Sequence, residues 1–337
     1  MHRLLFGMVA GAALYAQPAS LEFLNHGHPV LDAHNCYPYE GRWADRIDRA
    51  LSSGSPVSIE QDLAWWKGEA VLSHTAKTTG SEPTLRHYFF ERVRPLVEQA
   101  LARSDRASWP VIILHFDFKS NEKPLLRAVW KLLGEYEAWL TTAPKTADPH
   151  QLAPLDAKPI LVVTEDSDAQ EEVFFGSLPV GAKLRLFGSA HTAALDKGSR
   201  QERAHLAATL PPDKLLIDRP TNYRRWWNNS WYEVEEGGQA RAGEWTKEDA
   251  GRLKALVEYA HQRGYWIRFY TLDGFTPSED RGWGDNYNFG SSAAVQLRWR
   301  AALEAGVDFI ATDQYEDLAA VMRASPPRTT ALADPSQ

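Results

Sequence analysis

The residues best suited to chemistry stand in short polar clusters within or just after apolar runs of the sequence. Glu60 and Asp62 stand two residues apart in one such cluster, and Asp117 and Lys119 have the same spacing in another. Because side chains two apart in an extended strand point to the same side, each pair is expected to face one site. The full set of candidates is His34, Asn35, Glu60, Asp62, His74, Asp117 and Lys119.

The acidic members of this set predict a metal site. Three carboxylates, those of Glu60, Asp62 and Asp117, would repel one another at one point unless a cation lay between them. Oxygen ligands suit a hard ion, so we expect one Mg²⁺ or Ca²⁺. Asn35 is a further candidate ligand, although an asparagine here can equally fix the conformation of a loop.

Two histidines beside such an ion would supply a general base and a general acid. We expect His34 to take the proton of the nucleophile and His74 to protonate the leaving group. Lys119 would neutralise developing charge, with an ion pair to a nearby acid as the alternative. Arg268 and Tyr270 are candidates for binding phosphate or headgroup, and the alternative for Arg268 is an internal ion pair. A metal, a base and an acid are together typical of displacement at a phosphodiester.

The elements that must position these residues are eight short runs rich in apolar and β-branched residues, separated by helical patterns. Eight strands alternating with helices predict a single (β/α)₈ barrel of the TIM type, with its active site at the carboxyl ends of the strands. The alternative is an open doubly wound sheet, but no glycine-rich phosphate loop follows the first run. The runs lie near 29–35, 56–63, 111–119, 159–166, 183–190, 214–220, 265–272 and 307–313.

Apolar residues at helical spacing predict helices over 85–103, 125–140 and 246–264. The last of these opens with a Thr-Lys-Glu-Asp cap and closes on Gly264. We expect His115 to point away from Asp117 and to pack beneath the barrel or against a helix.

A segment dense in tryptophan and arginine, RPTNYRRWWNNSWYEVEEGG, follows the predicted sixth strand. Its Trp226 and Trp227 are candidates for a rim that binds a polyol headgroup or touches a membrane surface. The alternative is an aromatic patch that packs on itself.

Composition and the two ends of the chain narrow the class of protein. The 337 residues carry a formal net charge of −7, which argues against a nucleic-acid partner, and the single cysteine, Cys36, excludes an intrachain disulfide.

Residues 1–16 have the pattern of a signal peptide, so a secreted or periplasmic protein is expected. Residues 17–325 would form the barrel, and the Pro- and Ser-rich residues 326–337 a disordered tail. We expect a monomer.

The order His34-Asn35, Glu60-x-Asp62 and His74 within VLSH resembles the phospholipase C-like phosphodiesterase superfamily. That superfamily includes the phosphatidylinositol-specific phospholipases C and the glycerophosphodiester phosphodiesterases, and the resemblance runs from residue 30 to about residue 320. It implies a TIM-type barrel, paired catalytic histidines and a metal held by the Glu-x-Asp of the second strand.

Single positions refine this resemblance. Asp117 stands where the superfamily places a third carboxylate, and Asp117-Phe118-Lys119 is similar to the Asp-x-Lys of the phospholipase D toxins. Asn35 resembles the metal-shell asparagine of the eukaryotic phospholipases C. The overall likeness is greatest to uncharacterised bacterial members and to fungal proteins linked to mitochondrial inheritance. The glycerophosphodiesterases carry His-Arg-Gly where this chain has His34-Asn35-Cys36.

The residues and the resemblance together predict an exported, metal-dependent phosphodiesterase acting on a small-molecule or lipid phosphodiester, with transient contact to a membrane surface. One alternative is a lyase that forms a cyclic phosphate, as the phospholipase D toxins do. Another is a non-catalytic barrel that binds phosphorylated headgroups. A metal-dependent hydrolase of another bond is disfavoured, because such enzymes usually bind zinc through histidine-rich shells.

Overall fold

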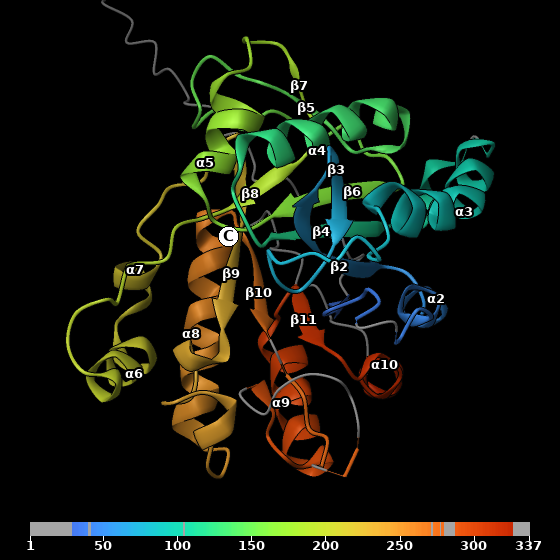
Figure 1. Ribbon diagram of the computed structural model, residues 1–337. Coiled ribbons are helices and arrows are strands. Elements are labelled where there is room, and N and C mark those ends of the chain that lie inside the picture. Colours follow the sequence, from blue (N-terminus) through green and yellow to red (C-terminus); the bar gives the residue numbers. More distant parts are fainter. Residues whose placement is uncertain are drawn as a thin grey trace, which may run out of the picture.

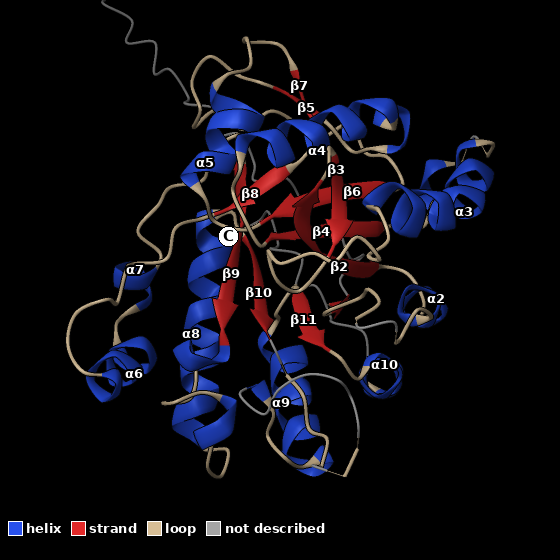
Figure 2. Cartoon of the chain, viewed as in Figure 1, coloured by secondary structure: helices blue, strands red, loops and turns tan. Residues whose placement is uncertain are grey.

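Eight parallel strands close into a barrel, which confirms the predicted (β/α)₈ fold (Figures 1 and 2). The first strand, β1, pairs with both β2 and β11, and these two pairings complete the circle. The barrel strands are β1 (Val30–Ala33), β2 (Val57–Trp66), β4 (Ile112–Phe118), β6 (Ile160–Thr164), β8 (Phe187–Ser189), β9 (Arg224–Ser230), β10 (Trp266–Tyr270) and β11 (Phe309–Thr312).

The computed structural model describes residues 29–39, 42–103, 105–270, 272–276, 278–279 and 287–325. The predicted signal peptide and the predicted tail lie outside the described residues, so both stay predictions.

Helices fill most connections between the strands, and Figure 2 shows them around the outside of the barrel. The α-helices are α2 (Arg46–Ser52), α3 (Glu91–Leu101), α4 (Lys123–Glu135), α5 (Asp168–Glu171), α6 (Arg200–Thr209), α7 (Pro212–Leu215), α8 (Lys247–Arg263), α9 (Ser292–Ala305) and α10 (Tyr315–Ala324). Short π or 3₁₀ turns are η1 (Arg86–Phe90), η2 (Arg106–Ser108), η3 (Glu137–Trp139), η4 (Glu172–Gly176), η5 (Trp231–Glu233) and η6 (Gln239–Arg241).

The three predicted helices are present as η1 with α3, as α4 with η3, and as α8. Helix α8 begins with the predicted capping box, in which Thr246 and Asp249 each accept a hydrogen bond from the other's backbone N–H. It ends at Gly264, whose φ of 84° is the left-handed conformation that glycine adopts without strain.

Two further pairings lie outside the barrel. Strand β3 (Glu69–Leu72) runs antiparallel to the end of β2 and extends it as a hairpin arm. Strands β5 (Ala143–Pro144) and β7 (Lys183–Leu184) form a separate two-stranded sheet.

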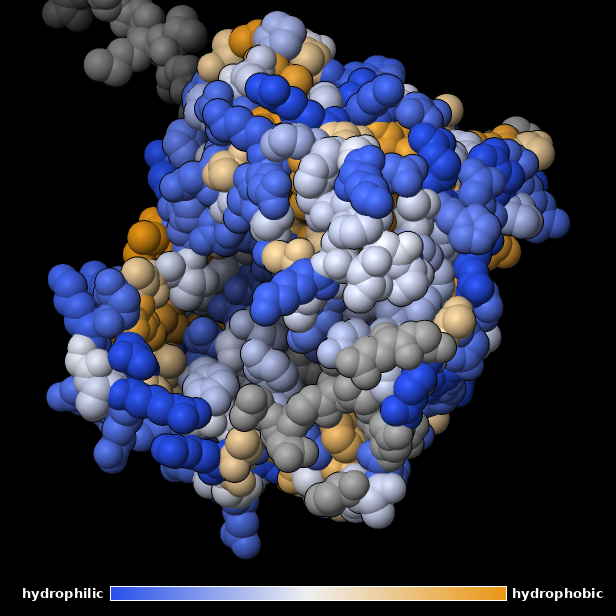
Figure 3. Space-filling view, in the orientation of Figure 1, coloured by the Kyte–Doolittle hydropathy of each residue, from blue (hydrophilic) through white to orange (hydrophobic). Residues whose placement is uncertain are grey.

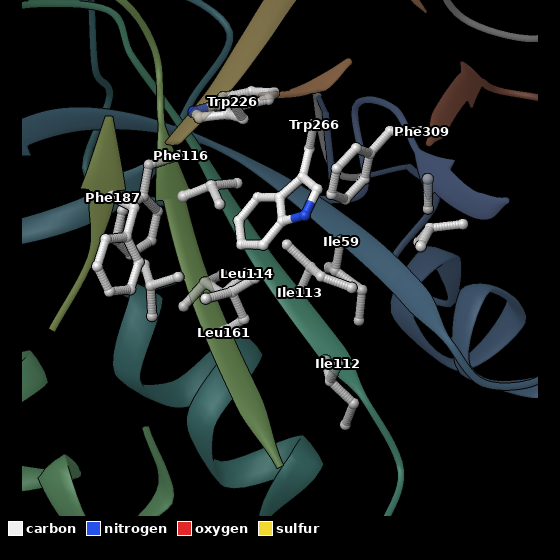
Figure 4. Close-up of a cluster of buried hydrophobic side chains, with 14 of the residues drawn as sticks. Ile59, Ile112, Ile113, Leu114, Phe116, Leu161, Phe187, Trp226, Trp266 and Phe309 are labelled. Carbon is white, nitrogen blue, oxygen red and sulfur yellow. The ribbon is translucent and has the colours of Figure 1, made fainter. Parts of the chain in front are cut away.

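A layer of large apolar side chains fills the core below the carboxyl ends of the strands (Figure 4). Trp226, Trp266 and Phe309 belong to this layer and are almost completely buried. Burying side chains of this size is the main favourable contribution to folding, and it gives the polar residues above a rigid base.

The prediction of the sixth strand was wrong. The run near 214–220 forms the short helix α7 and a loop, and the sixth strand is β9, inside the segment rich in tryptophan and arginine. Arg224 is the first residue of this strand. Its charge is paired, because Asp166 and Glu171 lie within ion-pair distance of it. Leu215 and Leu216 explain the apolar run, because both are buried in the hydrophobic core without joining the sheet.

The surface offers no extended apolar face in the view of Figure 3, where hydrophobic residues lie in small groups among hydrophilic ones. Among the described residues, no helix is long and apolar enough to cross a membrane.

Candidate active site

Three carboxylates converge where the pairing of β2 with β4 ends. The two strands pair in register with Asp62 opposite Asp117, and Glu60 lies two residues before Asp62 on the same side. One oxygen from each of Glu60, Asp62 and Asp117 lies within 4.8 Å of the others. We call these residues the mouth cluster. The predicted convergence of the three acids is therefore present in the fold.

The mouth cluster fits a hard cation. Asp62 is fully buried, and its Oδ1 has no hydrogen-bond partner among the described residues. Burial raises the pKa of Asp62, although His74 and Lys119 oppose this effect. A buried, unpartnered carboxylate oxygen is costly unless something binds it. Oxygen donors of this kind are the ligands of Mg²⁺ and Ca²⁺.

Lys119 lies against the same carboxylates. Its Nζ is 2.6 Å from Asp62 and 2.7 Å from Asp117, and these contacts raise the pKa of Lys119 although burial opposes the rise. The lysine therefore offsets part of the charge of the mouth cluster, and its ammonium group lies where a phosphoryl oxygen could accept a hydrogen bond from it.

His34 follows β1 and lies on the other side of Glu60. Its Nδ1 is 2.9 Å from Asp313, and its Nε2 is 3.6 Å from Glu60. Burial alone would lower the pKa of His34, but the charges of Glu60 and Asp313 outweigh burial and raise it to about 9. Asp313 holds the imidazole ring in one orientation, as a catalytic histidine requires.

His74 reaches the site by a different route, since the hairpin of β2 and β3 brings it back beside Asp62. The distance from its Nδ1 to Asp62 Oδ2 is 2.9 Å, and its ring packs edge-on against Tyr39 with centroids 6.2 Å apart. Its side chain is 42% exposed, compared with 14% for His34. One histidine is thus mostly buried and the other faces solvent, which suits a pair with different roles in proton transfer.

Asn35 and Tyr37 connect His34 with Asp62 and His74. Asn35 has a φ of 50°, a conformation that asparagine tolerates better than most residues, and its amide nitrogen is 2.6 Å from His34 Nδ1. The Tyr37 hydroxyl lies 2.6 Å from Asp62, 2.9 Å from Asn35 and 3.1 Å from His74. Sequence reasoning missed Tyr37. The role of Asn35 as a metal ligand stays a prediction.

Arg268 does not reach freely into the cavity. Its guanidinium forms ion pairs with Asp32 and Glu60 and donates a hydrogen bond to Asn228 Oδ1 at 2.9 Å. Burial raises the pKa of Glu60, but His34 and Arg268 lower it well below its usual range. The alternative of an internal ion pair therefore describes Arg268 better than a direct phosphate contact does. Tyr270 lies in the cavity wall, so its predicted contact with substrate stays a prediction.

The expectation for His115 was wrong. Residues two apart in a strand share a face, so His115 points inward below Asp117. Its Nε2 is 2.7 Å from Glu165, and its Nδ1 is 3.4 Å from Glu60. The nearby carboxylates raise the pKa of His115 well above its usual value, against the effects of burial and of Arg268. This residue supports the floor of the site.

The placement of Trp226 and Trp227 on an exposed rim was also wrong. Both lie in β9 and are buried, and their indole N–H groups donate to Thr164 O and Thr192 Oγ1 at 2.9 and 2.8 Å. The ring of Trp226 packs edge-on against that of His115 with centroids 5.0 Å apart. These side chains stabilise the barrel and do not line the cavity.

The mouth encloses a cavity of about 500 Å³, several times the volume of a phosphate group. Its lining carries five carboxylates and two permanent cations, so a bound cation would balance an excess of negative charge. The lining consists of His34, Asn35, Glu60, His74, Asp117, Lys119, Glu165, Asn228, Arg268, Tyr270, Asp273, Tyr287 and Asp313.

Comparison with known proteins gives matches among solved structures. No protein-family model and no curated protein matches the sequence. Solved structures similar to the chain include two glycerophosphodiester phosphodiesterases from Parabacteroides distasonis ATCC 8503. One has 12% identity and a TM-score of 0.43 and covers 92% of this chain and 93% of its own. The other has 11% identity and a TM-score of 0.46 and covers 88% of this chain and 98% of its own.

The HPPK-DHPS of Plasmodium falciparum is also similar, with 9% identity and a TM-score of 0.44 over 89% of this chain and 48% of its own. Structures from the family whose motifs the sequence resembles are thus among the neighbours. At these identities and TM-scores the likeness carries no argument about activity. The fold assignment rests on the strand order, and the site rests on its own geometry.

Proposed function

We propose that the protein is a metal-dependent phosphodiesterase that cleaves a small-molecule or lipid phosphodiester. The observation that carries this proposal is the mouth cluster, flanked by His34 on one side and by His74 and Lys119 on the other, at the floor of one cavity. A carboxylate cluster alone is compatible with simple cation binding. Two histidines beside it, one at Glu60 and one at Asp62, add the proton transfers that a displacement at phosphorus needs.

Glu60, Asp62 and Asp117 would hold a divalent ion such as Mg²⁺ or Ca²⁺, with Asn35 as the predicted fourth ligand. When bound, the ion would supply charge neutralisation at the phosphoryl oxygens and would increase the acidity of the attacking hydroxyl or water. His34, oriented by Asp313, and His74, oriented by Asp62, would share the roles of base and acid across the cavity. Lys119 would donate a hydrogen bond to a phosphoryl oxygen and stabilise the charge that develops there.

Hydrolysis of bis(p-nitrophenyl) phosphate by the purified protein tests the proposal. We expect activity that EDTA abolishes and that Mg²⁺ or Ca²⁺ restores, and that falls by about 10²–10⁴-fold in His34→Ala and in Glu60→Ala. His87→Ala, on the exposed surface of η1, should leave the rate unchanged. Calorimetric titration with Mg²⁺ and Ca²⁺ should show binding to the wild-type protein and weaker binding to Glu60→Ala.

Activity that resists EDTA and both substitutions would contradict the mechanism. Metal binding without turnover of this diester, of glycerophosphodiesters or of phosphoinositides would favour the headgroup-binding barrel instead. Release of a cyclic phosphate, visible by ³¹P NMR, would identify the lyase alternative.

We also propose that the protein is exported, because residues 1–16 have the pattern of a signal peptide. Amino-terminal sequencing of protein recovered outside the cytoplasm would show the cleaved chain. Recovery of the uncleaved chain only would contradict this proposal.

A further inference from the structure

Glu165 is a carboxylate of the mouth cavity for which the catalytic proposal gives no role. It directly follows β6, lines the cavity, and has a side chain that is 25% exposed. It does not belong to the mouth cluster, and it orients neither of the two proposed catalytic histidines. Its carboxylate is therefore accessible to a substrate in the cavity without being committed to a metal ion or to proton transfer.

Two donors hold this carboxylate in one position. Its Oε1 lies 2.7 Å from His115 Nε2, and its Oε2 accepts a hydrogen bond from Asn228 Nδ2 at 2.6 Å. Asn228 is held in turn, because its amide oxygen accepts a hydrogen bond from Arg268 at 2.9 Å. A carboxylate has about four sites for accepting hydrogen bonds, so about two remain. Glu165 thus offers a rigid acceptor to a ligand that donates a hydrogen bond.

Glu165 lies close to the mouth cluster. A single imidazole ring, that of His115, separates it from Glu60, because one nitrogen of this ring is 2.7 Å from Glu165 and the other is 3.4 Å from Glu60. Glu60 and Glu165 line the same cavity, whose volume of about 500 Å³ is several times that of a phosphate group. A phosphodiester bound at the mouth cluster therefore has room for one of its ester groups beside Glu165.

The charges around Glu165 favour a neutral ligand. Two basic side chains lie near it, and His115 is in direct contact. Burial would lower the pKa of Arg268, but the nearby carboxylates, including that of Glu165, raise it. The charge of Glu165 is thus largely balanced without a ligand. A hydroxyl group donates a hydrogen bond without adding charge, whereas a further anion would be repelled by the carboxylate.

The aromatic wall of the cavity also favours a neutral headgroup. The rings of Tyr270 and Tyr287 belong to this wall, with centroids 6.1 Å apart. Cationic headgroups such as choline bind on the faces of aromatic rings. Here the guanidinium of Arg268 already lies over the Tyr270 ring, 5.4 Å from its centroid, so a second cation there would be repelled. The carbon skeleton of a polyol can pack against these rings without such repulsion.

We infer that Glu165 is a specificity-determining residue of the mouth cavity. Its carboxylate accepts a hydrogen bond from a hydroxyl group of a neutral, polyol-like headgroup, and it disfavours a headgroup that carries a further negative charge. This inference rests on one part of the proposed function, the binding of a phosphodiester at the mouth. It adds the chemical class of the group that the diester carries.

Binding of stable analogues tests the inference without relying on turnover. Monoesters of methylphosphonic acid carry the single negative charge of a phosphodiester, and ³¹P NMR titration of the full chain in Mg²⁺ measures their dissociation constants. The 2,3-dihydroxypropyl and propyl esters have the same carbon skeleton and differ only in two hydroxyl groups. We expect the wild-type protein to bind the dihydroxypropyl ester at least about tenfold more tightly than the propyl ester.

Glu165→Gln should reduce this preference to less than about threefold, because the amide has a donor where the carboxylate has an acceptor. It should also bind the 2-carboxyethyl ester more tightly than wild type does, because the repulsion is removed. The matched control is Glu171→Gln, which makes the same substitution in α5, outside the lining of the cavity, and should keep the wild-type preference. Thermal unfolding checks that all variants are folded.

The inference is overturned if the wild-type protein binds the dihydroxypropyl and propyl esters equally, or if Glu165→Gln keeps the preference. Tighter binding of the choline ester than of the dihydroxypropyl ester, lost in Glu165→Gln, would overturn it in favour of a cationic headgroup. Hydrolysis of bis(p-nitrophenyl) phosphate without the preference would contradict this inference alone. The preference without hydrolysis of any diester would contradict catalysis alone.

Discussion

The mouth cluster and a second group of two acids and a histidine differ in how their charges are compensated. The second group, here called the outer cluster, consists of Asp168, Glu171 and His191, whose ligand atoms also lie within 4.8 Å of one another. Arg224 compensates it, with its Nη2 2.6 Å from Glu171, and the Asp168 side chain is 90% exposed. Asp62 of the mouth cluster is fully buried and keeps one oxygen unpartnered among the described residues.

The comparison shows that a short distance between acidic side chains is not enough to make a cation-binding site. The acids of the outer cluster reach water and already have an arginine partner, so they have little need of a further ligand. Buried acids at the floor of a cavity, with an oxygen left over, need a ligand. Each prediction below tests one side of this contrast.

Removing the arginine that pairs with Glu60 of the mouth cluster, or the one that pairs with Glu171 of the outer cluster, should have very different effects on stability. Arg268→Met leaves the buried Asp32 and Glu60 with histidines as their remaining cationic neighbours, His115 beside both and His34 beside Glu60, and we expect a loss of about 3–5 kcal/mol in the free energy of unfolding. Arg224→Met leaves acids that reach water, and we expect a loss of about 1–2 kcal/mol. Urea unfolding monitored by tryptophan fluorescence measures both. Equal losses would remove the distinction between the clusters.

Asp273, in the wall of the mouth, should make stability depend on pH. Burial and the charge of Asp313 raise the pKa of Asp273 to about 7 from 3.8. The folded protein therefore holds a proton that the unfolded chain releases between about pH 4 and pH 7, so this contribution to stability is full below pH 4 and is lost as the pH rises to 7.

In Asp273→Asn this loss should disappear. The asparagine oxygen can still accept from Thr312 Oγ1 and from the Asp313 N–H. The free energy of unfolding of the variant, relative to wild type, should rise from pH 4 to pH 7 by up to about 4 kcal/mol. Urea titrations in EDTA at several pH values measure the difference, and parallel curves for the two proteins would contradict the prediction.

Tyr37→Phe should separate positioning from binding at the mouth. It removes one hydroxyl from between Asp62, Asn35 and His74, while His74 and Lys119 still contact Asp62. We expect kcat on bis(p-nitrophenyl) phosphate to fall about tenfold with KM changed less than twofold, and stability to fall by about 1 kcal/mol. Tyr265→Phe is the matched control, because the Tyr265 hydroxyl is buried without a partner among the described residues. Equal effects of the two substitutions would argue against a positioning role.

Asp168→Asn should have the smallest effect. We expect a change below about 0.5 kcal/mol in the free energy of unfolding and no change in metal affinity or in rate. Calorimetric titration with Mg²⁺ beside the activity assay measures this. A weaker metal affinity in this variant would make the outer cluster a binding site and reverse the contrast.

The barrel itself could be predicted, because seven of its eight strands coincide with apolar runs and these runs are separated by helical patterns. The sixth strand could not, because RRWWNNS opens with two arginines and ends in polar residues. What makes it a strand is tertiary: Arg224 pairs with Asp166, and Arg225 donates a hydrogen bond to Ala153 O. Such partners, more than 50 residues away in the case of Asp166, leave no local signal.

The mouth cluster was predictable from spacing, because a period of two fixes which side chains share a face. The two histidines were predicted from their places after apolar runs and from the family resemblance. The same rule, applied correctly, also places His115 inward. Asp313 ends the last predicted strand and had the same signal as the other candidates. Tyr37 had no such signal in the sequence, since the position of its side chain depends on how the turn after β1 is folded.

The contact between His34 and Asp313 has a consequence for how the protein is made. These residues are 279 positions apart, on the first and last strands of the barrel, and they meet only when β11 closes against β1. Contacts between such distant segments form late in folding, because the loop between them must first be ordered. A chain still emerging from the ribosome therefore has its proposed metal ligands before it has an oriented His34, and the proposed activity would begin only when synthesis is nearly complete.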